Sequence, residues 1–144
     1  MNNGIPVKLH IKSTQTSDEG SIGSMEFYTE GKYYEKQGSK YISYAETEIS
    51  GLEGTNTFIK LSGGEAALIR SGAYSSKMIF QVGRETKNQY TTEYGVFDLS
   101  VLTEAIDINV CNALINSVYL KYRLSINYGE AYLNEMDIRI VYNT

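Results

Sequence analysis

Cysteine, proline and tryptophan are almost missing from this sequence of 144 residues, which holds one cysteine, one proline and no tryptophan. Because the single cysteine, Cys111, cannot form a disulfide within the chain, a disulfide-stapled domain is excluded and a reducing compartment is favoured. One proline leaves nearly every backbone N–H free to donate in a strand ladder. These absences favour a reduced, sheet-forming protein.

Long apolar runs and clusters of positive charge are also lacking. No apolar stretch approaches the roughly 20 residues of a membrane helix, and the N-terminal sequence MNNGIPVKLHIK has no apolar core of signal-peptide length. The formal net charge is −4 and no basic run occurs, whereas a surface that follows a phosphate backbone needs clustered lysine and arginine. We therefore expect a cytoplasmic protein with neither a membrane nor a nucleic acid as partner.

Residues that hold metals or cofactors are scarce. His10 is the only histidine and alternates with Leu9 and Ile11, so we expect it to face solvent. A lone histidine without acidic neighbours is not a metal site. The glycines of SGLEGT and SGG flank no predicted helix, so they do not form a phosphate-binding loop. We expect no metal and no cofactor.

Strand patterns dominate what is present. From Tyr41 to Thr103 short apolar runs alternate with polar residues and are separated by glycine turns, which is typical of antiparallel strands with one wet face. Gly63-Gly64 predicts a two-residue hairpin, and Tyr94-Gly95 predicts a bend within a strand. Helical periodicity is almost absent, and we expect at most a short helical turn near 102–105 or 112–116.

These patterns predict an all-β fold, with residues 1–144 forming a single antiparallel β-barrel domain of about 8–10 strands. A meander of this length must close on itself or pack as two sheets, because its strand edges otherwise stay open. The predicted strands are 5–16, 22–35, 40–50, 55–62, 65–71, 76–84, 88–94, 95–103, 105–111, 116–128 and 131–143. Alternation directs the following residues inward: Ile5, Val7, Leu9, Ile11, Met78, Phe80, Val82, Phe97, Leu99, Val101, Val118, Leu120, Tyr122, Leu124, Ile126, Met136, Ile138 and Ile140.

Four segments carry a resemblance to a known family. They are EGKYY (30–34), YAETEISGLEGTNTFIKL (44–61), LIRSGAYSSKMIF (68–80) and YTTEYGVFDLSVLT (90–103). In this order they resemble the YwiB-like family of small bacterial proteins, a domain of unknown function. The resemblance implies a calycin-like barrel related in architecture to lipocalins, and it implies no established activity. Lipocalin ligands do not carry over, because the Gly-x-Trp signature of lipocalins needs a tryptophan that this chain lacks.

Charged residues interrupt the inward face on two predicted strands. Glu46 and Glu48 share a face with Tyr44, and Arg70 lies on the inward face of strand 65–71. Thr57 stands on the strand between them, so we expect these side chains to meet inside the barrel. The complete set of lumen candidates is Tyr44, Glu46, Glu48, Thr57, Arg70, Tyr90 and Thr92.

Three interpretations of this polar group stay open. In the first it is a structural plug, in which Arg70, a carboxylate and tyrosine hydroxyls satisfy one another and fix the strand register. In the second Arg70 anchors a carboxylate or phosphate bidentately at the base of an apolar cavity. In the third Glu46 is a general base, although no nucleophile, metal set or second base accompanies it.

We predict a non-enzymatic barrel that binds a small amphipathic or anionic ligand. Its apolar tail would lie against Met78, Phe80, Phe97 and Leu99. The alternative is a protein-interaction or homo-oligomeric module with a filled barrel and no ligand. The 13 tyrosines favour that alternative, because tyrosine is enriched in interface cores. An open lumen would support ligand binding, and a filled lumen would support the interaction module.

Overall fold

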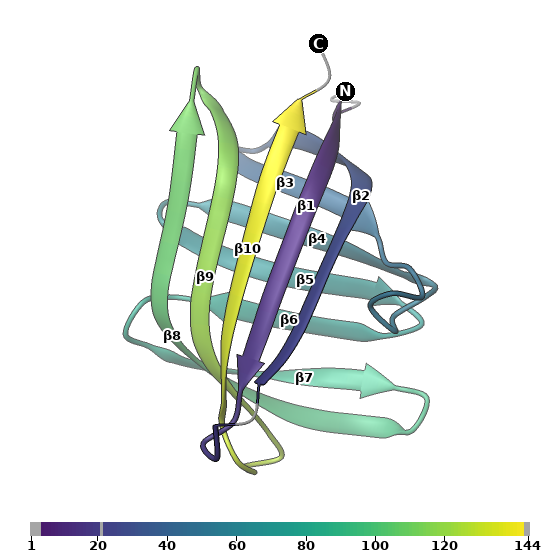
Figure 1. Cartoon of the computed structure of the whole chain (residues 1–144), viewed down its shortest axis with the longest axis vertical. Helices are drawn as coiled ribbons and strands as arrows, with labels where there is room; N and C mark the ends of the chain where they lie inside the picture. The colour runs from purple at the N-terminus through teal and green to yellow at the C-terminus, as the bar shows by residue number, and fades with distance from the viewer. Residues whose placement is uncertain (1–3, 21, 143–144) are drawn as a thin grey trace.

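Antiparallel strands form the whole computed structural model, which describes residues 4–20 and 22–142. The ten strands are β1 (Ile5–Thr16), β2 (Ile22–Lys36), β3 (Ser39–Ala45), β4 (Thr55–Ser62), β5 (Glu65–Gly72), β6 (Ser75–Phe80), β7 (Glu85–Thr92), β8 (Gly95–Cys111), β9 (Leu114–Ile126) and β10 (Tyr132–Tyr142). Each strand pairs with the next, and β1 also pairs with β10, so the sheet closes into a barrel (Figure 1). The predicted all-β barrel is confirmed. Within the described ranges no helix could cross a membrane.

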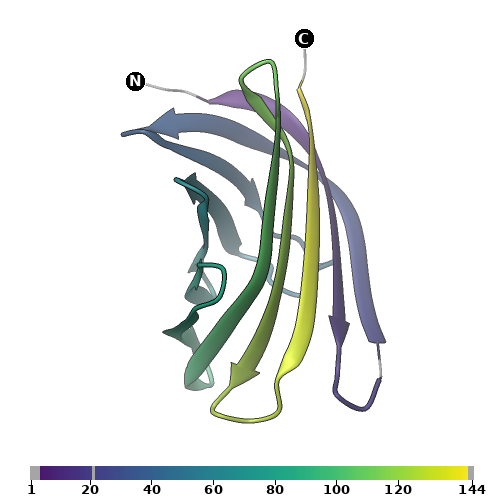
Figure 2. The same cartoon turned by 90° about the vertical axis from the view of Figure 1, so that its left-hand side faces the viewer.

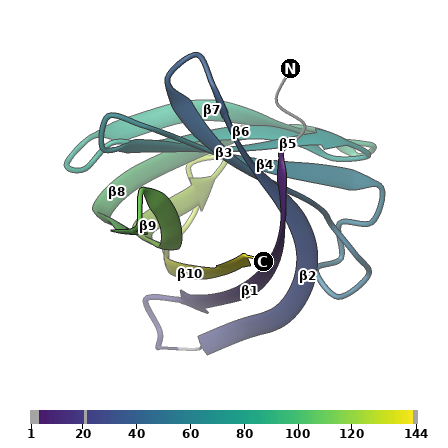
Figure 3. The same cartoon turned by 90° about the horizontal axis from the view of Figure 1, so that it is seen from above.

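The strands run in two main directions around the barrel. In Figure 1 the strands β9, β10 and β1 follow the long axis, whereas β4, β5 and β6 cross behind them. Figure 2 shows β8, β9 and β10 extending along the height of the molecule. Viewed from above, β4–β7 lie on one side of the interior and β1 and β10 on the other (Figure 3). Side chains of both walls therefore point into one shared core.

The middle of the barrel is filled by apolar side chains. The predicted inward residues of β10 and most of those of β1 are buried. A group of inward side chains from both walls has no exposed surface at all: Ile42, Ile59, Leu68, Phe80, Val101, Val118, Leu120 and Ile138. A space large enough for a water molecule beside any of these side chains would leave part of that side chain exposed. This section of the lumen is therefore closely packed.

Strand β8 is longer than predicted and is bent by a bulge. The two predicted strands 95–103 and 105–111 are halves of one strand, and its pairing with β9 shifts between Thr103 and Ala105. The extra residue, Glu104, lets Thr103 and Ile106 both face the core, because a bulge resets the alternation. Neither of the two segments at which a short helical turn was possible, 102–105 and 112–116, is helical, since both extend as strand or form a tight turn.

Of the two predictions about turns, one is confirmed and one was wrong. Gly63 and Gly64 have φ values of 57° and 84° and join β4 to β5 as the predicted two-residue hairpin. Tyr94, by contrast, lies with Glu93 in a full turn between β7 and β8 rather than in a bend within one strand. The glycine that suggested the bend, Gly95, is instead the first residue of β8 with a φ of 135°.

Some inward assignments fail because strands end earlier than the pattern suggests. Strand β6 stops at Phe80, so Val82 lies in the following loop and is 58% exposed. Ile5 begins β1 at the rim of the barrel and is 41% exposed. Strand β3 stops at Ala45, before a turn that spans residues 48–51.

Candidate functional site

The polar side chains of the predicted site form a row in which each residue stands directly opposite the next on the neighbouring strand. Tyr44 pairs with Thr57, Thr57 with Arg70, Arg70 with Ser76 and Ser76 with Tyr90. Residues that stand opposite one another share a face of the sheet, and this face is the inward one because Tyr44, Thr57 and Ser76 are buried. The structure therefore brings together four of the predicted lumen residues in one row.

Glu46 joins this row from just beyond the end of β3. Its backbone N–H donates to the carbonyl of Thr55 at 2.8 Å, which extends the β3–β4 pairing by one step. The side chain is 1% exposed. The Thr57 hydroxyl donates a hydrogen bond to Glu46 Oε2, and Arg70 Nε lies 3.7 Å from the same oxygen. The predicted meeting of Glu46, Thr57 and Arg70 is present.

Burial shapes the electrostatics of the aromatic members. Desolvation raises the pKa of the Tyr44 phenol far above its usual range, and the negative charge of Glu46 raises it further, while Arg70 opposes both effects. Burial also raises the pKa of Tyr90, and the positive charge of Arg70 lowers it in part. Both phenols therefore stay neutral at ordinary pH and act as hydrogen-bonding groups rather than as bases.

Arg70 is incompletely satisfied. Its Nε atom is buried and donates no hydrogen bond, and its separation of 3.7 Å from Glu46 is an ion-pair contact that is too long for a charge-assisted hydrogen bond. The Arg70 side chain is 20% exposed, compared with 1% for Glu46. The carboxylate is therefore buried more deeply than the guanidinium, part of which reaches solvent.

One predicted member of the site, Glu48, lies elsewhere, and Thr92 lies at the end of β7, one inward step beyond Tyr90. Glu48 is exposed in the turn after β3, where its carbonyl accepts from the N–H of Gly51 at 3.1 Å, so its inward prediction was wrong. The inward alternation ends when the strand ends. Thr92 is half-buried and caps the β7–β8 turn. Its hydroxyl accepts from the N–H of Tyr94 at 3.0 Å, a local role that the sequence analysis missed.

Tyr122 is a neighbour of the site that the sequence analysis did not include. It is buried on β9, its ring centroid is 4.7 Å from that of Phe80, and burial raises its pKa while Arg70 lowers it in part. Alternation correctly predicted that Tyr122 faces inward. Its proximity to Arg70 had no signal in the sequence, because β9 and β5 are not neighbours in the sheet and meet only across the lumen.

The residues predicted to hold an apolar ligand tail are mostly core residues. Phe80, Met78 and Leu99 are 0%, 4% and 5% exposed, so no ligand reaches them without displacing the core. Phe97 differs, because it is half-buried and stands opposite Tyr90. Within the described ranges, no group of three or more His, Cys, Asp or Glu side chains could hold a metal ion.

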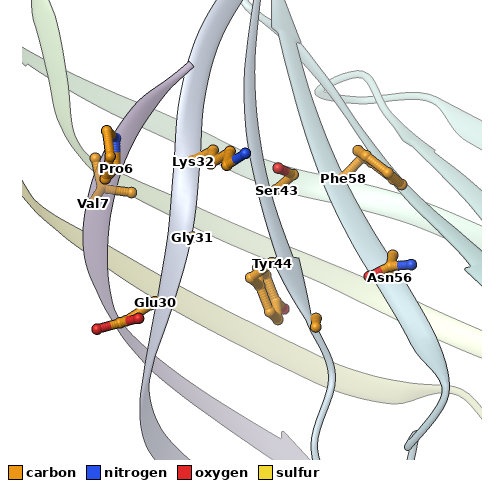
Figure 4. Close-up of a pocket in the computed structure, with 10 residues that line it drawn as sticks. Pro6, Val7, Glu30, Gly31, Lys32, Ser43, Tyr44, Asn56 and Phe58 are labelled. Carbon is orange, nitrogen blue, oxygen red and sulfur yellow. The ribbon is translucent and has the colours of Figure 1, made fainter. Parts of the chain in front are cut away.

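A groove of about 500 Å³ lies on the outside of the barrel over β1–β4 (Figure 4). Its lining includes Lys32, Ser43, Asn56 and Phe58, which alternate with the inward residues of their strands. Gly31 forms part of the floor, where the backbones of β2 and β3 approach closely. Tyr44, a member of the inward row, also lines the groove, whereas Arg70 does not.

The fold and the site define a small closed antiparallel barrel with a packed centre and an inward row of polar side chains around Arg70. The family model described as "Domain of unknown function (DUF1934)" matches residues 9–140, and the chain belongs to this family. It is 31% identical over 133 residues to the "Uncharacterized beta-barrel protein YwiB" of Bacillus subtilis (strain 168), covering 92% of this chain and 91% of that protein. The crystal structure of YwiB from Bacillus subtilis matches with a TM-score of 0.82 and 30% identity, over 100% of this chain and 96% of that chain. The predicted resemblance is confirmed.

Proposed function

We propose that this protein binds a small organic anion at the open end of the barrel, with Arg70 as its anchor, and that it is not an enzyme. The observation that carries the proposal is the Arg70 guanidinium, whose Nε is buried without a hydrogen-bond partner beside a carboxylate that Thr57 already holds. An unsatisfied buried donor costs about 1–3 kcal/mol. Because Nε is buried beside Glu46, the anion would accept from the outer N–H groups of the guanidinium and add charge-assisted hydrogen bonds there.

The chemistry of the guanidinium selects the type of ligand. Arginine presents five N–H donors in a planar fork that fits a carboxylate or phosphate in two parallel hydrogen bonds. Glu46 approaches one edge of Arg70 from the core side, which leaves the edge toward the open end for a second acceptor. Tyr90 stands two strands away on the same face and offers a neutral phenol beside the same opening.

A second candidate function is a protein-interaction or homo-oligomeric module. The observation that favours it is the packed centre of the barrel, in which inward side chains on both walls have no exposed surface. Three tyrosines are also strongly exposed, with Tyr28 at 77%, Tyr94 at 83% and Tyr128 at 75%. Exposed tyrosine is enriched at interfaces. These three residues lie on different strands and turns, so they do not define one surface.

Titration with small anions tests the proposal. Benzoate, butanoate and phenyl phosphate are added to the labelled protein while two-dimensional NMR follows the backbone amides and the Arg70 Nε–H resonance. We expect shifts at Arg70 and Tyr90, and we expect Arg70→Gln to weaken binding roughly 10- to 150-fold, since hydrogen bonds to charged groups contribute about 1.5–3 kcal/mol. Arg139→Gln, on the exposed outer face of β10, is the matched control. If no anion binds in an Arg70-dependent way, the proposal fails and the interaction module becomes the better account.

A further inference from the structure

Several apolar residues face into the barrel and are nevertheless open to solvent. Leu124 stands opposite the fully buried Val101 and also opposite Tyr132, and Ile126 stands opposite the buried Leu99. The shared register places Leu124, Ile126 and Tyr132 on the inward face. Ile126 is nevertheless 46% exposed and Tyr132 is 37% exposed. Single exposed apolar residues are ordinary on an outer surface, but these line the inside of the barrel at one end.

This apolar end is continuous with the Arg70 site. Arg70, Ser76, Tyr90 and Phe97 stand opposite one another in succession on β5, β6, β7 and β8. The next inward residue of β8 after Phe97 is Leu99, and Leu99 stands opposite Ile126 on β9. With strands about 4.8 Å apart, the three intervals from Arg70 to Phe97 span about 14 Å along the inner wall. The apolar shelf, defined here as Phe97, Leu124, Ile126 and Tyr132, therefore begins within reach of a molecule held at Arg70.

The shelf carries no charge of its own. Its inward neighbours on β10 and β1 are Asn134 and Gln15, which stand opposite each other and are uncharged. Asn88, one inward step from Tyr90, has a buried amide nitrogen without a hydrogen-bond partner. The wall between Arg70 and the shelf therefore offers neutral donors and apolar surface, and it places no second cation there that would demand a second anionic group.

We propose that the ligand of this site is an amphipathic organic anion whose acidic head binds Arg70 and whose apolar tail lies along the shelf. This inference rests on the proposed function and names the class of ligand. It also moves the tail away from the core residues Met78 and Phe80, which are packed, to the end of the barrel where inward apolar surface is still open. Burying that surface under a tail would add a hydrophobic contribution to the affinity.

Measuring how the affinity depends on the chain length of the acid separates the contribution of the acidic head from that of the apolar tail. Butanoate, hexanoate, octanoate and decanoate are titrated below their micelle concentrations by calorimetry. We expect the dissociation constant to fall about two- to fourfold for each added methylene, because full burial of a methylene is worth about fourfold in affinity. The fall should stop once the tail covers the shelf. Octyl phosphate, compared with octanoate, distinguishes a phosphate head from a carboxylate head.

Two variants of similar exposure make the test specific. Ile126→Ser should flatten the chain-length dependence and leave butanoate binding within twofold of the parent. Ile5→Ser is the control, because Ile5 is 41% exposed, compared with 46% for Ile126, and lies on a different strand in a separate part of the sheet. Equal chain-length dependence in parent and Ile126→Ser would overturn the shelf. If short acids bind in an Arg70-dependent way but affinity does not change with chain length, the proposed role of the shelf is contradicted, whereas the proposed function is supported. Absence of Arg70-dependent binding at every length would overturn both.

Discussion

Arg70 stands directly opposite Thr57 in the β4–β5 ladder, and both side chains approach the same carboxylate oxygen of Glu46. The hydroxyl donates a hydrogen bond to that oxygen, whereas the guanidinium is held at 3.7 Å. Glu46 therefore satisfies Thr57 more fully than it satisfies Arg70. The guanidinium therefore keeps hydrogen-bonding capacity that Glu46 does not use, and the proposed anion would accept from its outer N–H groups.

Removing the buried carboxylate should destabilise the fold. Glu46→Ala strands the positive charge of Arg70 and should lower the free energy of unfolding by about 3 kcal/mol, the low end for a broken buried pair, because Arg70 is 20% exposed and so partly hydrated. Urea denaturation followed by circular dichroism measures the change. Glu48→Ala, in the exposed turn nearby, is the control and should stay within about 0.5 kcal/mol of the parent. Equal midpoints for both variants would mean that the Glu46–Arg70 pair contributes nothing to stability.

Alkaline pH should destabilise the folded protein through Tyr44. Its folded-state pKa is raised, first by burial and then by Glu46, so above about pH 10 the unfolded chain loses the tyrosine proton while the folded protein keeps it. The stability contributed by this group is complete below pH 10 and falls as the pH rises, by at most about 1.4 kcal/mol per pH unit.

The Tyr44 prediction is tested by how steeply the stability falls with increasing pH, rather than by the stability at one pH. Urea midpoints measured between about pH 9 and 11 should fall less steeply in Tyr44→Phe than in the parent. Tyr28→Phe makes the same exchange at a position that is 77% exposed and should keep the parental slope. Identical slopes in the parent and in Tyr44→Phe would contradict the prediction.

The close approach of β2 and β3 should depend on a glycine. A Cβ atom at Gly31 would lie 2.4 Å from the carbonyl oxygen of Ser43 and 2.8 Å from Leu9 Cδ1. Backbone cannot move aside as a flexible side chain can, so Gly31→Ala should cost about 1–3 kcal/mol or more through overpacking. Gly23→Ala on the same strand meets nothing within 4 Å and should be neutral or slightly stabilising. Thermal denaturation compares them, and equal melting temperatures would show that the strands can separate at no cost.

The alternation of side chains predicted much of the fold because each strand carries its own face assignment. On β1 and β10 the apolar residues that were predicted to face inward are the ones that the structure buries, apart from Ile5 at the rim. The sequence failed where an element ends. Glu48 and Val82 continue the alternation of β3 and β6, yet both lie in loops. Periodicity gives the face of a residue only while the strand continues.

The β8 bulge shows a second limit. The sequence around Glu104 shows two runs of alternating residues that are out of phase, and this pattern is compatible with the two predicted strands, 95–103 and 105–111. One strand with an inserted residue has the same pattern. Only its pairing with β9, continuous on both sides of the shift between Thr103 and Ala105, distinguishes the two.

The sequence by itself determined that this chain forms antiparallel strands, which residues face inward along most of them, and that an arginine and a glutamate enter the interior on nearby strands. It did so because these properties depend on residues two positions apart or joined by short turns. The tertiary structure alone decided that β1 meets β10 to close the barrel, that Tyr122 approaches Arg70 across the lumen, and that the centre is packed while the inward surface at Ile126 and Tyr132 stays open. These features depend on the curvature of the whole sheet and on contacts between strands that are distant in the chain, and neither is set by local alternation.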